Sequence, residues 1–169
     1  MKLVSDLRLL LVGLWLGAAI FFIVAAQSAM AIIPSRDMVW DLIASILPIL
    51  NKSGMAVGVL LLLTSLIPGQ MLNASQAWAE RILALAITLA CGIGEFVFGT
   101  MLDTIRTVMR AGNTRLEQIP INDPLRSRFD AIHEYSTWSL IVAMVAAFLV
   151  FFIISGKHFN SPKIEKMKV

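Results

Sequence analysis

Charged residues and cysteines are scarce in this chain of 169 residues, and each scarcity excludes a class of protein. Only 15% of the residues are charged, whereas soluble domains carry about 25%. The single cysteine, Cys91, excludes an internal disulfide and a metal site built from cysteines alone. The net charge of +3 is too small to predict a nucleic-acid partner. A soluble domain, a disulfide scaffold and a nucleic-acid-binding protein are therefore not expected.

Motifs of the common catalytic sites are also missing. The chain contains no HExxH zinc motif, no phosphate-binding loop and no nucleophile elbow. Its two histidines, His133 and His158, lie too far apart along a helix to hold one haem from opposite sides. We therefore expect that the protein is not an enzyme and has no cofactor.

Apolar residues make up 58% of the chain and fall into long runs. A transmembrane helix needs about 20 apolar residues, and four runs approach this length. We expect an all-α integral membrane bundle in contact with the lipid bilayer, formed by a single domain over residues 1–156 and followed by a lysine-rich tail over 157–169. The expected spans are residues 9–33, 46–67, 78–102 with a helical extension to 111, and 129–154.

The segment between the first two spans, PSRDMVWDLIASILP, mixes charged and apolar residues. Trp40 is typical of the membrane interface, and Pro48 ends the segment. We expect a short interfacial helix here, with Pro48 bending its junction with the second span.

Glycines recur at spacings that allow two membrane helices to approach closely. GxxxG pairs occur in the first span and in the second, and two further glycines share one face of the third. The expected helix-packing glycines are Gly13, Gly17, Gly54, Gly58, Gly92 and Gly99.

Glu95 is an ionisable residue inside the expected third span. At 100° per residue it shares one face of the helix with small and polar residues, so it should point toward other helices rather than toward lipid. That face comprises Ala84, Thr88, Gly92, Glu95, Gly99, Asp103, Arg106 and Arg110. Lys52 enters the membrane from the same side, and we expect the two side chains to form an ion pair.

The same half of the bundle should hold further polar groups. Gln27 lies near the matching end of the first span, and His133 and Ser136 lie in the first turns of the fourth. Three interpretations of the resulting cluster of Glu95, Lys52, Gln27, His133 and Ser136 remain open: a structural ion pair, a water-lined substrate site, and a contact with a partner chain.

His133 has two candidate roles. It can hydrogen-bond across to the first or third span, or it can serve as a weak candidate metal ligand. Nine methionines suggest copper, because thioethers favour Cu(I), but no two methionines lie three or four residues apart. We expect the hydrogen-bonding role and no metal.

The basic residues are almost balanced between the two sides of the membrane, so orientation is weakly determined. The dense lysines of the tail favour both termini in the cytoplasm. We expect a bacterial inner-membrane location.

The chain resembles a known membrane family in two regions. LWLGAAIFFIVAAQSAM and the following IIPSRDMVWDLIASILP resemble the opening of the family that comprises transmembrane protein 205 and its bacterial relatives. RFDAIHEYS is similar to the start of that family's fourth span. The matching residues are Trp15, Gly17, Pro34, Arg36, Pro48, Phe129, His133 and Ser136. The resemblance implies a four-helix architecture and a domain of unknown function.

Two functions follow as expectations. The apolar half with its glycines, the Trp40 segment and the missing catalytic motifs favour a small scaffold or accessory subunit that packs against other membrane proteins or forms a homo-oligomer. The alternative is a transporter or binder of a small cation or metal, for example copper, that uses the cluster of glutamate, lysine and histidine.

Overall fold

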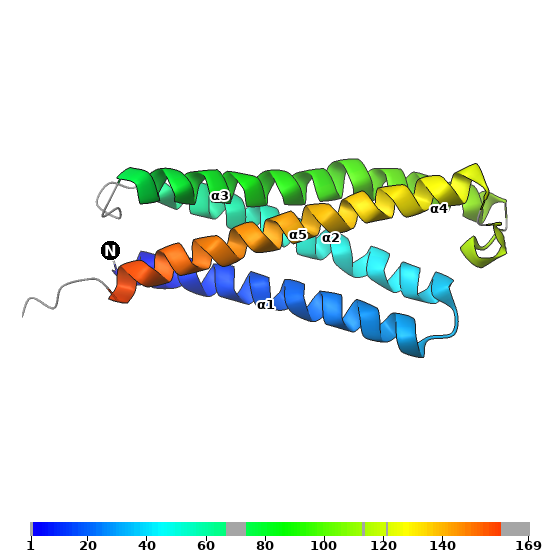
Figure 1. The fold of residues 1–169 in the computed structure, drawn as a ribbon, viewed down its shortest axis with the longest axis horizontal. Coiled ribbons are helices and arrows are strands. Elements are labelled where there is room, and N and C mark those ends of the chain that lie inside the picture. The colour runs from blue at the N-terminus through cyan, green and yellow to red at the C-terminus, as the bar shows by residue number, and fades with distance from the viewer. Residues whose placement is uncertain (1, 67–73, 113, 121, 160–169) are drawn as a thin grey trace, which may run out of the picture.

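The computed structural model describes residues 2–66, 74–112, 114–120 and 122–159, and all of its long elements are helices. Their bounds are α1 (Lys2–Ile32), α2 (Arg36–Ser65), α3 (Ala74–Ile93), the π-helical η1 (Gly94–Gly99), α4 (Thr100–Ala111), the short 3-10 helix η2 (Leu116–Gln118) and α5 (Pro124–Phe159). Because α3, η1 and α4 are continuous, they form one long rod (Figure 1).

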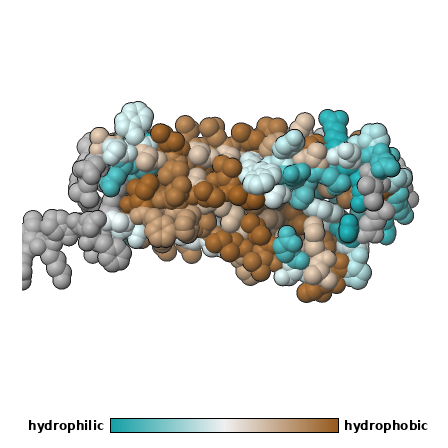
Figure 2. Space-filling model, viewed as in Figure 1, coloured by the Kyte–Doolittle hydropathy of each residue, from teal (hydrophilic) through white to brown (hydrophobic). Residues whose placement is uncertain are grey.

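Four of these helical stretches are long and apolar enough to cross a membrane: Leu3–Ile32, Arg36–Ser65, Ala74–Ala111 and Pro124–Gly156. The first turn of α1, the start of α3 and the end of α5 lie at one end of the bundle (Figure 1). Figure 2 shows apolar side chains over most of the visible face and a polar surface at the opposite end, around α4 and η2. The chain is therefore a multi-pass membrane protein in contact with lipid, as expected.

The expected interfacial helix is not a separate element. Residues 36–47 form the first turns of α2, which continues without interruption to Ser65 and contains Pro48. Pro48 has no N–H to donate to the carbonyl of Ala44, but the loss of one bond does not end a helix of 30 residues. A proline inside a membrane helix is tolerated where another donor, such as water or a ligand in a cavity, can reach the freed carbonyl.

The half of the bundle nearest the termini has a core of buried side chains from α1, α2, α3 and α5, here called the membrane core. Trp15 lies within it and donates its indole N–H to the carbonyl of Leu50 at 3.0 Å. A Cβ atom at Gly54 would lie 2.6 Å from the Trp15 ring and from Cys91 Sγ. The absent side chain of Gly54 therefore makes room for Trp15.

Gly58 also permits a close approach, because a Cβ there would lie 3.0 Å from the backbone N of Thr88 and 3.1 Å from the carbonyl of Ala84. No helix of the described chain packs against Gly17, which has open space around it, and Gly92 has only a distant contact. Gly13 has ordinary contact with Phe151, and the space at Gly99 is limited by the rod's own backbone. Sequence spacing does not show which of the apolar faces of a membrane helix is buried.

The polar end has a second, smaller core, here called the end core. It joins α4, η2 and the start of α5 and consists of Leu102, Ile105, Met109, Leu116, Ile119, Phe129 and Ile132. In α4, the helical extension of the third span, the face expected to point inward is wrong by one residue. Asp103 and Arg110 are exposed, and the buried residues are Leu102, Ile105 and Met109. Large apolar side chains fill this interior better than the charged residues beside them.

The fourth span starts earlier than expected, at Pro124. Proline is pre-organised for the first position of a helix, and the Asp123 carboxylate accepts a hydrogen bond from the N–H of Leu125 at 2.8 Å. The helix α5 continues through Phe159, so the expected tail begins inside it. Residues 160–169 of that tail lie outside the described residues.

Candidate binding clefts at the polar end of the bundle

A cleft of about 300 Å³ separates α2 from the η1–α4 part of the rod, and we call it the interface cleft. Its volume is at the lower limit of ordinary ligand pockets. Two basic side chains and two acidic ones line it among apolar groups. The lining residues are Ile43, Ala44, Leu47, Pro48, Asn51, Lys52, Gly94, Glu95, Gly99, Thr100, Leu102, Asp103, Arg106 and His133.

The ion pair predicted from the sequence is present in this cleft. Lys52 Nζ lies 3.1 Å from Glu95 Oε1. The two partners differ in environment, because the Lys52 side chain is 61% exposed and the Glu95 side chain only 13%. Glu95 belongs to the π-helical η1, whose wider turns are frequent at functional sites. The glutamate is therefore held at the edge of the bundle interior, while the lysine is free to turn outward.

Asn51 is the most deeply buried polar side chain that lines the cleft, with 4% of its surface exposed. Its amide lies flat against Gly94, where a Cβ atom would be 3.2 Å from Asn51 Nδ2. Within the described residues, the amide makes no hydrogen bond. An amide without a partner in the protein can donate to and accept from a molecule in the cleft, so Asn51 marks a place where a ligand or water is expected to bind.

A second, more apolar cleft of about 280 Å³ lies between α1, α2 and α5, and we call it the apolar cleft. Gln27, His133 and Ser136 line it. The expected polar cluster is thus divided: Lys52 and Glu95 face the interface cleft, Gln27 and Ser136 face the apolar cleft, and His133 lines both.

The His133 ring packs against aromatic side chains. Its centroid is 4.5 Å from that of Trp40, in an edge-to-face arrangement, and 6.5 Å from that of Phe129. The expected hydrogen bond to the first or third span is wrong, since within the described residues the His133 side chain makes none. Trp40 offers an apolar face at this position, and the imidazole packs on it.

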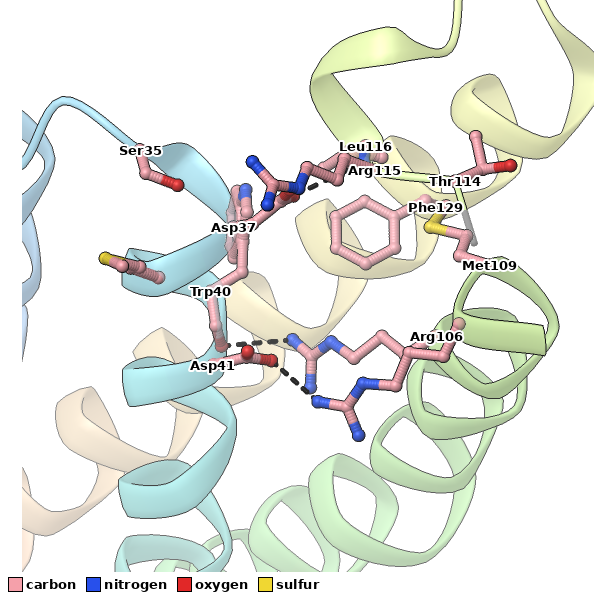
Figure 3. A pocket seen from close by; sticks show the side chains of 12 residues that line it. Ser35, Asp37, Trp40, Asp41, Arg106, Met109, Thr114, Arg115, Leu116 and Phe129 are labelled. Carbon is pink, nitrogen blue, oxygen red and sulfur yellow. Dashed lines mark hydrogen bonds and ion pairs between the residues drawn. The ribbon is translucent and has the colours of Figure 1, made fainter. Parts of the chain in front are cut away.

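A third cleft, the end cleft, has a volume of about 320 Å³ and opens between the start of α2 and α4 (Figure 3). Arg106 reaches across it from α4 toward the Trp40 carbonyl (Figure 3). Arg110 contacts the Asp41 carboxylate at 2.9 Å, and Arg106 donates to the carbonyl of Trp40 at 3.5 Å. The N–H of Leu116 donates to the Asp37 carboxylate at 3.3 Å. These bonds fasten the connection between α4 and α5 to α2.

The donor groups around these clefts are a poor match for a metal. Among the residues that the structure describes, no group of three histidine, cysteine, aspartate or glutamate side chains could hold a metal ion. Lys52 and Arg106 also line the interface cleft beside its carboxylates, and their charges would repel a cation.

Sequence reasoning missed one buried ion pair at the other end of the bundle. Arg8 of α1 pairs with Glu80 of α3, and both side chains are almost completely buried. The pair was missed because Arg8 directly precedes the expected first span, a position typical of a flanking charge. Glu80 lies near the start of α3. A signal was available, because Glu80 lies three residues after Ala77 and four before Ala84, both of which are buried.

Fold and clefts together define a small multi-pass helical membrane protein with charged clefts at one end. The chain belongs to the family described as "Domain of unknown function (DUF4149)", whose model matches residues 10–112. The match runs from residue 10 of α1 through α4 and includes every residue that lines the interface cleft except His133. No curated protein matches the chain, and no solved structure matches it either. The likeness to transmembrane protein 205 stays a prediction.

Proposed function

We propose that the protein is a non-catalytic scaffold or accessory subunit that packs against other proteins of the membrane. The observation that carries this proposal is the filled interior of the membrane core. Val12, Ala84 and Ile87 have no exposed surface, and Gly58 brings the backbones of α2 and α3 together. A transport path needs polar, hydrated groups through the same region. A closely packed interior leaves no such path, which favours a protein that acts through contacts on its outer surface.

The outer face of α1 is the surface that we assign to a partner helix. In the most apolar stretch of each span, 17% of the residues are buried for α1, against 28–33% for the other three. Gly17 lies on this face with open space around it, between the exposed side chains of Leu14 and Phe21. A glycine between two large side chains forms a notch that a second helix can enter.

Transport or binding of a cation has less support. The interface cleft contains Glu95 and Asp103, but Lys52 and Arg106 line the same cleft. A cation would meet as much repulsion as attraction there.

The proposal includes a place in the cell. We assign the protein to a bacterial inner membrane with both termini in the cytoplasm. The lysines near the C-terminus support this orientation under the positive-inside rule, and an even number of spans puts the two termini on one side.

Gly17→Ile tests the scaffold role, because it fills the notch without touching the interior of the chain. The full chain is purified in a mild detergent, and its mass and companions are measured. We expect a stable partner or dimer whose affinity falls roughly tenfold or more in this variant, since overpacking costs about 1–3 kcal/mol. Val24→Ile, a small change at another exposed position of α1, is the matched control.

A monomer without companions would contradict the proposal, as would equal association of the Gly17→Ile variant and the wild type. A homo-oligomer that carries a metal would favour the cation-binding alternative.

A further inference from the structure

We propose that the interface cleft binds the zwitterionic head group of a membrane lipid, with its phosphate beside Lys52 and Arg106 and its ammonium beside Glu95 and Asp103. This inference does not depend on the scaffold role. It follows from the charge of the cleft, its unfilled hydrogen-bonding groups and its level in the membrane.

The first argument is charge balance. The lining of the cleft contributes two positive side chains and two negative ones. A ligand of one charge would be attracted by one pair and repelled by the other. A molecule that carries both charges can place each beside its opposite, which makes an amine–phosphate head group the best electrostatic match.

The second argument is an unfilled hydrogen-bonding site. Asn51 is 4% exposed as a residue, and within the described residues its side-chain amide makes no hydrogen bond, so the donor and the acceptor of the amide are open to a ligand in the cleft. Ala44 lines the same cleft, and its carbonyl lacks the helical donor that Pro48 cannot supply. An amide can donate to a phosphate oxygen, and a carbonyl can accept from an ammonium. Asn51 and Ala44 thus supply polar partners for both ends of such a head group.

The third argument is depth. On the outside of the rod, Phe96, Val97 and Met101 are exposed apolar residues. Within one further turn the exposed residues become polar, with Asp103 and Thr104. Lipid contacts an apolar surface, and head groups contact the polar surface next to it. The outer part of the cleft, at Asp103 and Arg106, therefore lies at the level of lipid head groups, and its inner part lies beside the lipid chains. This position favours a lipid over a soluble molecule as the ligand.

The Lys52–Glu95 ion pair gives this site a means of opening. Lys52 is mostly exposed and can turn toward an incoming phosphate, whereas the Glu95 side chain is mostly buried and has less room to move. The lipid ammonium then takes the position of the lysine beside Glu95. Each carboxylate and each base keeps a partner of opposite charge, so opening the pair leaves no charge unpaired.

Native mass spectrometry of the full chain tests the proposal. The detergent-purified protein is titrated with phosphatidylethanolamine, with phosphatidylglycerol, which lacks the ammonium, and with soluble phosphoethanolamine. We expect phosphatidylethanolamine to bind at least about tenfold more tightly than either of the others, the difference expected for a hydrogen bond to a charged group. Equal binding of phosphatidylglycerol would overturn the zwitterionic site. Equal binding of soluble phosphoethanolamine would overturn its assignment to lipid.

Two variants locate the site. Glu95→Gln and Asp103→Asn each remove a carboxylate from the cleft and should weaken phosphatidylethanolamine binding about tenfold. Asp130→Asn removes an exposed carboxylate that does not line this cleft and should leave binding unchanged. Asp103 is exposed, so its variant decides the test even where Glu95→Gln fails to fold. Wild-type affinity in the Asp103→Asn variant would overturn the proposal.

Discussion

The membrane core and the end core are held together in different ways. In the membrane core, helices meet through shape: Trp15 fits against Gly54, and Thr88 against Gly58. In the end core, α4, η2 and α5 are tied to each other and to α2 by polar contacts. Arg126, for example, donates to the carbonyls of Leu116 and Ile119 at 3.2 and 3.0 Å.

The difference follows from the surroundings of each half. Lipid chains are as apolar as leucine side chains, so burial from lipid supplies little force and close fit has to hold the helices together. At the polar end, water is present, so burial of apolar side chains regains its strength, and the hydrogen bonds to the connecting segment fix how the helices meet. The comparison predicts that stability depends mainly on glycines in the membrane core and on carboxylates at the polar end. The buried Arg8–Glu80 pair is the exception to be tested.

The largest effect on stability is expected from Glu80→Gln. This variant challenges the comparison because it removes a charge from the half of the bundle in which close packing is expected to dominate. Arg8 would lose the buried carboxylate of Glu80 with which it pairs, and breaking a buried ion pair costs roughly 3–5 kcal/mol. The free energy of unfolding in mixed micelles measures this loss.

Asp41→Asn is the matched control, because the Asp41–Arg110 pair is exposed and such pairs contribute about 0–1 kcal/mol. Equal stability of the two variants would mean that the Arg8–Glu80 pair is no stronger than a surface pair.

Gly58→Ala sharpens the comparison with an intermediate effect. The new Cβ would press on the backbone of α3 at Thr88 and Ala84, and overpacking of this kind costs roughly 1–3 kcal/mol. Gly17→Ala adds the same methyl group to open space and should change the free energy of unfolding by less than about 0.5 kcal/mol. If both variants unfold alike in the same micelles, close fit is not what holds the membrane core.

The smallest effect is expected from Asp37→Asn at the polar end. The substitution weakens the hydrogen bond from the Leu116 N–H, which is worth roughly 0.5–1.5 kcal/mol. We expect faster hydrogen exchange at the Leu116 amide and unchanged exchange in the membrane core. Faster exchange at Ile87 as well would show that the two cores unfold as one unit.

Sequence patterns were sufficient for the number of long apolar helices and for one contact. Apolar runs of span length predict four helices because a bilayer has a fixed thickness. The Lys52–Glu95 pair could be predicted because both residues enter the membrane from one side and a charge within it needs a partner.

The rotation of each helix was decided only by the tertiary structure. A helix that is apolar on every side has no periodicity that separates its buried face from its lipid face. This is why Gly17 lies outside the bundle although Gly58 lies inside, and why Leu102 rather than Asp103 faces the end core. The sequence by itself determined how many helices cross the membrane and which charges need partners. Packing decided which partners they find, because Arg8 and Glu80 belong to helices whose contact no local pattern encodes.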